Sequence, residues 1–271
     1  MLALGAVRDD VRHTLRMAWL DPGIEATARH PVFFAAAWSA TRPNVGRTFL
    51  GLARVLRGSA VDSIRGWGGP PDVEGRLGSM LTDEERRRVG DTARAVHASA
   101  AKVQIVIHAL HRAARRERIG GTGLEEPPVR RGVPDWQRWM AVLPAADPPT
   151  GVLAAAGERM ATPGSPPALR PFSRWPAALE AVWDGLAPSV DAEVWGRAAA
   201  RIRRGLLSGV ARLPHPVALQ WPVLRERGFD EESRQALEET LAAYEAAAPG
   251  QTLAAAFVWL SLGGPELGSE G

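Results

Sequence analysis

Two stretches of this 271-residue chain decide its fold: RHPVFFAAAWSATRPNV at residues 29–45 and RWPAALEAVWDGLAPSV at residues 174–190. At an offset of 145 residues (183 − 38), they share an arginine, two prolines and the central tryptophan, Trp38 or Trp183. A second pair of stretches, 82–104 and 229–251, matches at an offset of 147 residues (251 − 104). The ordered matches predict that the chain is an internal duplication.

Apolar residues recur at helical spacing along most of the chain, and no run of alternating β-branched residues occurs. We therefore expect an all-α fold in which two tandem helical repeats pack as an intramolecular pseudo-dimer, with a ligand cleft between them. The expected segments are repeat 1 at 1–121, a linker at 122–146, repeat 2 at 147–264 and a flexible tail at 265–271.

Each repeat is expected to hold an opening helix (about 5–16 and 148–160), a tryptophan-bearing helix, a further helix and two closing helices. Helix starts are indicated by capping residues: Thr82 with Glu85 in a capping box, Asp230 in the second copy, and Asn44 and Ser189 after matched prolines. In the linker, two tryptophans at 136 and 139 indicate that it packs onto the body.

Composition excludes several classes of protein. The chain has no cysteine, so disulfides, thiolate nucleophiles and zinc-thiolate sites are excluded. Its formal net charge is only +3, and acidic residues are interleaved with the arginines, which argues against nucleic acid as a partner. The longest apolar stretch, 253–262, is about half of the roughly 20 residues that span a bilayer. We expect a cytoplasmic protein with no membrane partner.

Three histidines, His97, His108 and His111, are spaced so that they could share one helical face and offer imidazoles to a metal. No nearby carboxylate completes such a set, and an ordinary helix face is the favoured interpretation. The glycine-rich stretches 66–69 and 120–123 lack the spacing of a dinucleotide or phosphate loop. We expect neither a metal nor a cofactor.

Four segments resemble the group I 2-haloacid dehalogenases: VRHTLRMAW at 11–19, residues 30–44, residues 174–183 and LPHP at 213–216. The resemblance covers both copies and most of the chain. It implies two all-helical repeats that form a pseudo-dimer, with a cleft that binds 2-haloalkanoic acids. In that family a water activated by an aspartate displaces halide directly, without an ester intermediate or a cofactor. The resemblance also implies a homodimer.

The catalytic residues match less well. The resemblance places the aspartate in the turn before the second tryptophan-bearing helix, which here reads GSPPALR at 164–170, with Ala168 or a near neighbour in its place. A family asparagine expected near Ala98–Ala101 is also absent. Asp21 occupies the matching turn of the first copy and is the candidate catalytic residue, although it could simply cap the helix that begins near Pro22.

Four residues are expected to bind the substrate. Trp19 matches the pocket tryptophan of the family, and Tyr244 falls where a pocket tyrosine is expected. His97 is the repeat counterpart of Tyr244, and Ser165 lies in the turn opposite Asp21.

The function implied by the resemblance is hydrolytic removal of halide from 2-halocarboxylic acids, with little or no present activity because the family aspartate is missing. The alternative is a catalytically silent relative that binds a small carboxylate or apolar ligand in the inter-repeat cleft. A third interpretation follows from the closing helices, which resemble helical peroxidase reductases and carboxymuconolactone decarboxylase-like proteins. Their peroxidase chemistry needs a Cys-x-x-Cys, which this chain cannot supply.

Overall fold

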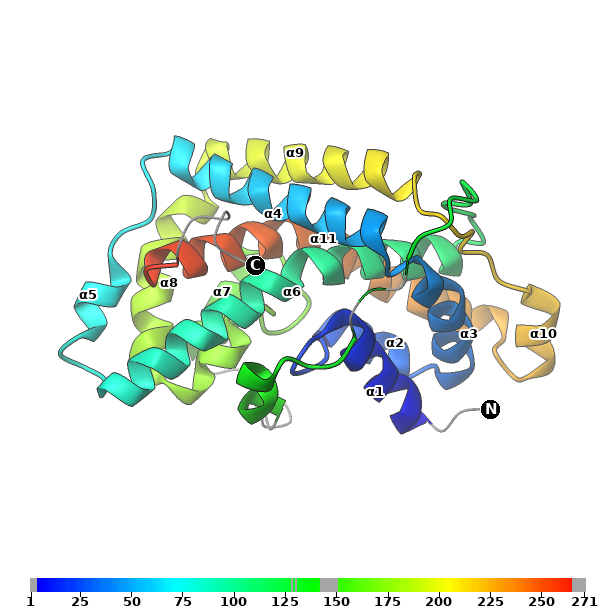
Figure 1. Cartoon of the computed structure of the whole chain (residues 1–271), viewed down its shortest axis with the longest axis horizontal. Coiled ribbons are helices and arrows are strands. Elements are labelled where there is room, and N and C mark those ends of the chain that lie inside the picture. Colours follow the sequence, from blue (N-terminus) through cyan, green and yellow to red (C-terminus); the bar gives the residue numbers. More distant parts are fainter. Residues whose placement is uncertain (1–3, 128, 130, 142–150, 265–271) are drawn as a thin grey trace.

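The computed structural model describes residues 4–127, 129, 131–141 and 151–264, and this part of the chain is built from helices (Figure 1). It contains no β-strand, only an isolated antiparallel bridge between Ile119 and Val217. The predicted all-α fold is confirmed. No helix in the same part of the chain is long and apolar enough to cross a membrane.

The first half holds six α-helices and one short 3-10 helix: α1 (Leu4–Leu15), α2 (Pro22–Ala28), α3 (Pro31–Thr41), η1 (Arg42–Asn44), α4 (Arg47–Gly66), α5 (Val73–Leu77) and α6 (Asp83–Ala114). A 3-10 helix, η2 (Asp135–Ala141), follows in the linker. The second half holds α7 (Gly151–Arg159), η3 (Arg170–Arg174), α8 (Pro176–Val190), α9 (Glu193–Val210), α10 (Trp221–Glu226) and α11 (Glu231–Ser261).

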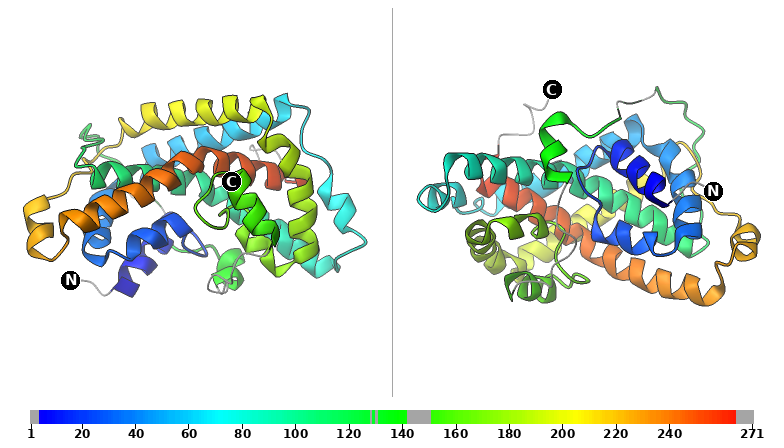
Figure 2. Two further views of the ribbon diagram at one scale, coloured as in Figure 1. Left: turned by 180° about the vertical axis from the view of Figure 1, so that it is seen from behind. Right: turned by 90° about the horizontal axis from the view of Figure 1, so that it is seen from below.

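The two long helices α6 and α11 run side by side through the middle of the molecule, and α4 packs beside α9 along one side (Figures 1 and 2). At one end of this framework α1, α2 and α3 lie with α10 of the second half, and at the other end α7 and α8 lie with α5 of the first half (Figure 1). Contacts between the halves are reciprocal. Helix α5 of the first half packs on α8, and Phe33 of α3 contacts the rings of Trp221 and Phe229 from the second half.

One continuous hydrophobic core joins both halves, with fully buried aromatic side chains at Phe33, Phe49, Phe172 and Phe257. Trp38 is buried, and its Nε1 donates a hydrogen bond to Asp10 Oδ2 at 2.7 Å. Trp183, its partner in the sequence match, is only partly buried at the edge of the core.

Two of the predicted helix starts are confirmed. The Thr82 and Glu85 capping box is formed in full at the start of α6, and the Asp230 side chain accepts a hydrogen bond from Ser233 N at the start of α11. After α4 or α9, each half ends in two helices, as predicted: a short one (α5 or α10) and a single long one of 32 or 31 residues (α6 or α11). Helix α11 remains a single helix although Pro249 lies inside it.

The predicted caps at Asn44 and Ser189 were wrong. Asn44 lies in η1, and its Oδ1 accepts a hydrogen bond from His215 N at 2.8 Å, so it ties a loop of the second half to the first. Ser189 lies inside α8, which continues through Pro188. Sequence alone cannot reveal the distant loop that uses Asn44.

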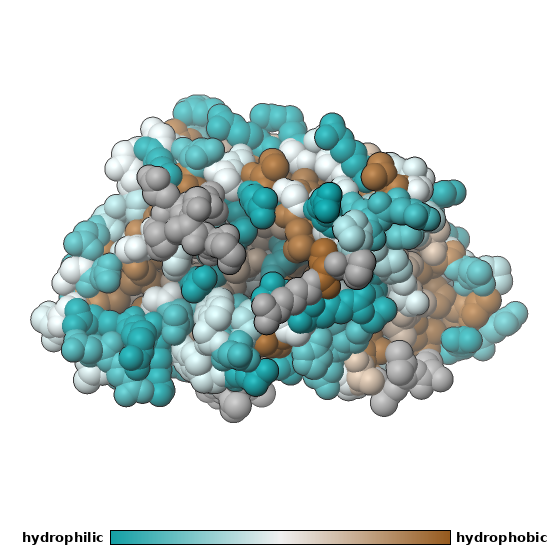
Figure 3. Space-filling view, viewed as in Figure 1, coloured by the Kyte–Doolittle hydropathy of each residue, from teal (hydrophilic) through white to brown (hydrophobic). Residues whose placement is uncertain are grey.

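The described part of the linker packs onto the body, as predicted. The Arg94 guanidinium lies 4.7 Å from the ring centroid of Trp136, and Arg88 lies 5.5 Å from that of Trp139. Hydrophilic side chains are spread over much of the surface in Figure 3. Residues 142–150, where repeat 2 was expected to begin, and the predicted flexible tail at 265–271 are outside the described residues.

Candidate functional site

A small cavity lies where the two halves meet, and both halves contribute to its wall. It encloses about 40 Å³, room for about three waters at ~10–15 Å³ each, and so fits a ligand of only a few non-hydrogen atoms. The first half lines it with Met17, Trp19, Asp21, Val96, Ser99, Ala100, Val103, Gln104 and Ile107. The second half lines it with Thr162, Pro167, Ala168, Tyr244, Ala247, Ala248 and Gln251.

Asp21 is the only carboxylic acid among the described residues of this wall, and it is 7% exposed. It is the N-cap of α2, and its Oδ1 accepts a hydrogen bond from Gly23 N at 2.8 Å. Burial raises the pKa of Asp21 to about 6, an effect that outweighs this hydrogen bond and the charge of Arg170. At neutral pH the carboxylate is therefore largely ionised yet close to its proton-binding range, as a general base should be.

Trp19 and Tyr244 are both partly exposed residues of the cavity wall. Burial and the nearby charge of Asp21 raise the pKa of the Tyr244 phenol, whereas Arg29 and Arg170 act in the opposite direction. Tyr244 is therefore a neutral hydrogen-bonding group. The positive charges of Arg29 and Arg170 lie close enough to affect the pKa of its phenol.

Ala168 also lines the cavity, in the turn where the resemblance places an aspartate at this residue or a near neighbour. Its side chain is a buried methyl group, so it supplies no proton acceptor. Its backbone N donates to Gln251 Oε1 at 3.2 Å, and Gln251 Nε2 donates to Thr162 Oγ1 at 2.7 Å. These bonds fix the turn of the second half against α11.

The cavity wall does not include the other two predicted binding residues, His97 and Ser165. The α6 residues that face the cavity include Val96, Ala100 and Gln104, so His97 points to another side of the helix. Its ring stacks on Trp259 with centroids 6.0 Å apart. Burial and the charge of Arg57 lower the pKa of His97 to about 3, so it is neutral at physiological pH.

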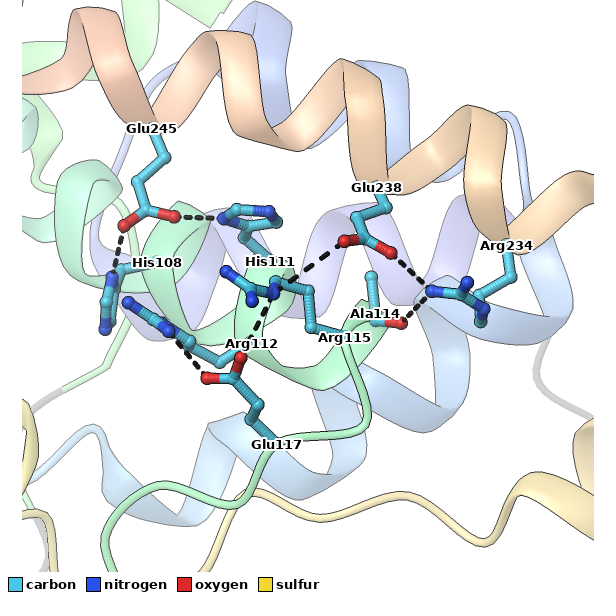
Figure 4. Close-up of polar contacts among 9 residues, drawn as sticks. All are labelled: His108, His111, Arg112, Ala114, Arg115, Glu117, Arg234, Glu238 and Glu245. Carbon is cyan, nitrogen blue, oxygen red and sulfur yellow. Dashed lines mark hydrogen bonds and ion pairs between the residues drawn. The ribbon is translucent and has the colours of Figure 1, made fainter.

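The other two of the three histidines considered as metal ligands, His108 and His111, contact a carboxylate. His108 Nδ1 lies 2.8 Å from Glu245 Oε1, and His111 Nδ1 contacts Glu245 Oε2 (Figure 4). No group of three metal-ligating side chains suitable for an ion occurs among the described residues. Glu245 belongs to α11, more than 130 residues away in sequence, so the pairing could not be seen from the local spacing of the histidines.

The sequence interpretation missed most of the wall, including its polar residues Ser99, Gln104, Thr162 and Gln251. Gln104 on α6 is 1% exposed; its Oε1 accepts a hydrogen bond from Thr252 Oγ1 at 2.8 Å, but its Nε2 has no partner. Its match with Gln251 across the repeats was the available signal, although no sequence pattern indicates which of the two amides is left unpaired.

No family model matches the chain, and no curated protein is similar to it in sequence. Solved structures of D-2-haloacid dehalogenases are similar to it in fold. A mutant in complex with D-2-CPA is 16% identical, with a TM-score of 0.84 over 96% of this chain and 91% of that one. A complex with L-LA is 17% identical, with a TM-score of 0.83 over 96% and 92%. The chain therefore has a haloacid dehalogenase-like fold.

Proposed function

We propose that the cavity binds a small 2-substituted carboxylic acid and that Asp21 activates a water there to displace halide from a 2-halocarboxylic acid. The observation that carries the proposal is the position of Asp21, a buried carboxylate with a raised pKa in the wall of a cavity between the two halves. The similarity in fold to D-2-haloacid dehalogenases, one of them in complex with D-2-CPA, supports the same class of ligand.

The proposed reaction needs no group beyond the protein, the acid and water. Asp21 takes a proton from the water while the water oxygen attacks the carbon that bears the halogen. The new carbon–oxygen bond forms as the carbon–halogen bond breaks, and the halide leaves with the electron pair. The product is the 2-hydroxy acid. Because Ala168 leaves the opposite turn without a carboxylate, the rate is expected to be low.

Halide release from each enantiomer of 2-chloropropionate tests this proposal. The wild type should release halide slowly, and Asp21→Asn, which keeps an acceptor for Gly23 N, should lose roughly 10² to 10⁴-fold in rate. Between pH 5 and 8 the rate should rise with pH as Asp21 ionises near pH 6. Ala168→Asp, which installs the carboxylate expected from the resemblance, should raise the rate.

Asp184→Asn is the matched control, because Asp184 is exposed on α8 and its only described partner is Arg76 at 3.7 Å. It should leave halide release unchanged. Release that persists in Asp21→Asn would show that a different group activates the water.

The second candidate is a protein that binds a small carboxylate or apolar ligand without turnover. Two observations favour it. Most of the wall is apolar, and Asp21 Oδ1 already accepts a hydrogen bond from Gly23 N as the N-cap of α2. Propionate or 2-chloropropionate that binds without any halide release would favour this candidate.

We also propose that the two halves descend from one duplicated helical unit. The order of the helices, the side-by-side packing of α6 with α11 and of α4 with α9, and the reciprocal contacts between halves support this origin. A duplication places the cavity near the axis that would relate the copies, which accounts for a wall drawn from both.

A further inference from the structure

The Gln104 side chain is built into the cavity wall as a donor without an acceptor. Its residue is almost completely buried, its Oε1 is held by Thr252 Oγ1, and its Nε2 makes no hydrogen bond. A buried donor without a partner typically costs roughly 1–3 kcal/mol, because it has given up its hydrogen bonds to water. Most buried polar groups in folded proteins have a hydrogen-bond partner, so an acceptor from a bound molecule would explain the unpaired Nε2.

Gln251 shows that the same side chain can be satisfied in this cavity. Both ends of its amide are used, with Ala168 N donating to Oε1 and Thr162 Oγ1 accepting from Nε2. Gln251 is therefore a structural brace between α11 and the turn of the second half. Gln104 has only one such anchor, which orients its amide and leaves the N–H groups for another molecule.

We propose that Gln104 Nε2 binds the ligand by donating a hydrogen bond to an acceptor oxygen at one end of it. The ligand is then a short molecule with a carboxylate or carbonyl oxygen at that end. Its body meets Ala100, Val103 and Ile107, which line the same cavity beside Gln104 on α6. Gln104 is thus the positioning residue of the site. This inference rests on the cavity's proposed role in ligand binding but not on the proposed hydrolysis.

The test measures propionate binding and thermal unfolding of the full chain for the wild type and Gln104→Leu. Propionate supplies the acceptor oxygens and a short apolar body but has no halide to lose. Gln104→Leu should weaken binding roughly 10- to 100-fold, as expected for the loss of a hydrogen bond to a charged group. Without propionate the variant should unfold at the same or a higher temperature, because it no longer buries an unpaired donor. A purely structural glutamine would lower that temperature.

Gln104→Glu keeps the size and one acceptor oxygen but removes the donor, and it should also weaken propionate binding. Gln137→Leu is the matched control, because Gln137 is a buried glutamine in η2 that does not line this cavity, and it should leave binding unchanged. Unchanged binding in Gln104→Leu, loss only in Gln137→Leu, or no binding by the wild type would each overturn the inference. Binding that depends on Gln104 without halide release from 2-chloropropionate would overturn the hydrolysis alone.

Discussion

At the scale of single residues, Asp21 has two effects on stability: its hydrogen bond stabilises α2, whereas its buried negative charge destabilises the fold. As an N-cap it stabilises α2, since its Oδ1 satisfies the N–H of Gly23. As a buried carboxylate in a mostly apolar wall it is costly to ionise, which is why its pKa is raised to about 6. As the pH rises, a larger fraction of Asp21 is ionised. The destabilisation by its buried charge grows, and so does the fraction of the protein in which Asp21 can accept a proton from water.

Asp21→Asn should therefore stabilise the protein at neutral pH while it removes the proposed base. A raised pKa in the folded state favours folding at low pH, and this contribution is lost as the pH rises from about 4 through about 6. Asparagine keeps the cap and does not ionise. We expect the variant to gain about 2–3 kcal/mol in free energy of unfolding at pH 8, at ~1.4 kcal/mol per pKa unit, and nothing at pH 4. Urea unfolding at both pH values measures it, and a gain of equal size at both would contradict the assignment.

His97 should have the opposite pH dependence. Its pKa is lowered to about 3 in the folded protein, so the unfolded chain takes up a proton first as the pH falls below about 6.5. The resulting loss of stability is about 1.4 kcal/mol per pH unit. His97→Phe keeps a ring against Trp259 and does not titrate. Between pH 6.5 and 4.5 its free energy of unfolding should fall less steeply than that of the wild type, and parallel curves would argue against a buried neutral histidine.

At the scale of elements, the start of α2 fixes the cavity because Gly23 leaves no room for a side chain. A methyl group added there would lie 2.8 Å from Ile107 Cδ1 and 3.1 Å from Tyr244 Cγ, both on side chains of the cavity wall. The absence of a side chain at this position lets α2 approach both α6 and α11.

Gly23→Ala should destabilise the protein by about 1–3 kcal/mol, the usual cost of overpacking, and should weaken propionate binding as Tyr244 and Ile107 shift. Gly51→Ala is the control, because a methyl group at that position in α4 would meet no atom within 4 Å apart from its chain neighbours and the backbone of its own helix, and alanine favours a helix. Both effects can be read from chemical unfolding and calorimetry. A Gly23→Ala protein with wild-type stability and binding would show that Ile107 and Tyr244 can move aside without loss of free energy.

Local contacts within one element could be predicted from the sequence, whereas contacts between distant elements could not. Capping by Thr82 with Glu85, by Asp230 and by Asp21 depends on residues two or three positions apart, so each could be read locally. Asn44 and Glu245 find their partners more than 130 residues away, where local patterns carry no information. The position of Asp21 on the cavity wall could be anticipated through the repeat offset, whereas the unpaired amide of Gln104 required the packed structure.

At the scale of the whole molecule, the two halves do not form separate cores. Buried residues from both halves belong to one cluster, α5 packs on the α8 helix of the other half, and Trp221 and Phe229 cover Phe33. The sequence repeat indicated two units, but the hydrophobic core is continuous across the boundary between the two repeats.

Fragments 1–146 and 147–271 should therefore be largely unfolded when expressed separately and should gain helical structure when mixed. Each fragment alone would expose the apolar faces of α6 or α11 that the other half covers. Circular dichroism and sedimentation of the fragments, alone and at equal concentration, would measure both properties. A fragment that folds cooperatively by itself would show that each half has a sufficient core of its own.

The unpaired amide of Gln104 has an evolutionary consequence. Mutation continually samples replacements of a buried residue, and those that improve folding without harming the organism are free to accumulate. A leucine at 104 would remove an unsatisfied donor, so a lineage selected for folding alone would have little reason to keep the glutamine. Reconstructed ancestors of this chain, tested for propionate binding, would date the point at which selection began to act on the occupant of the cavity.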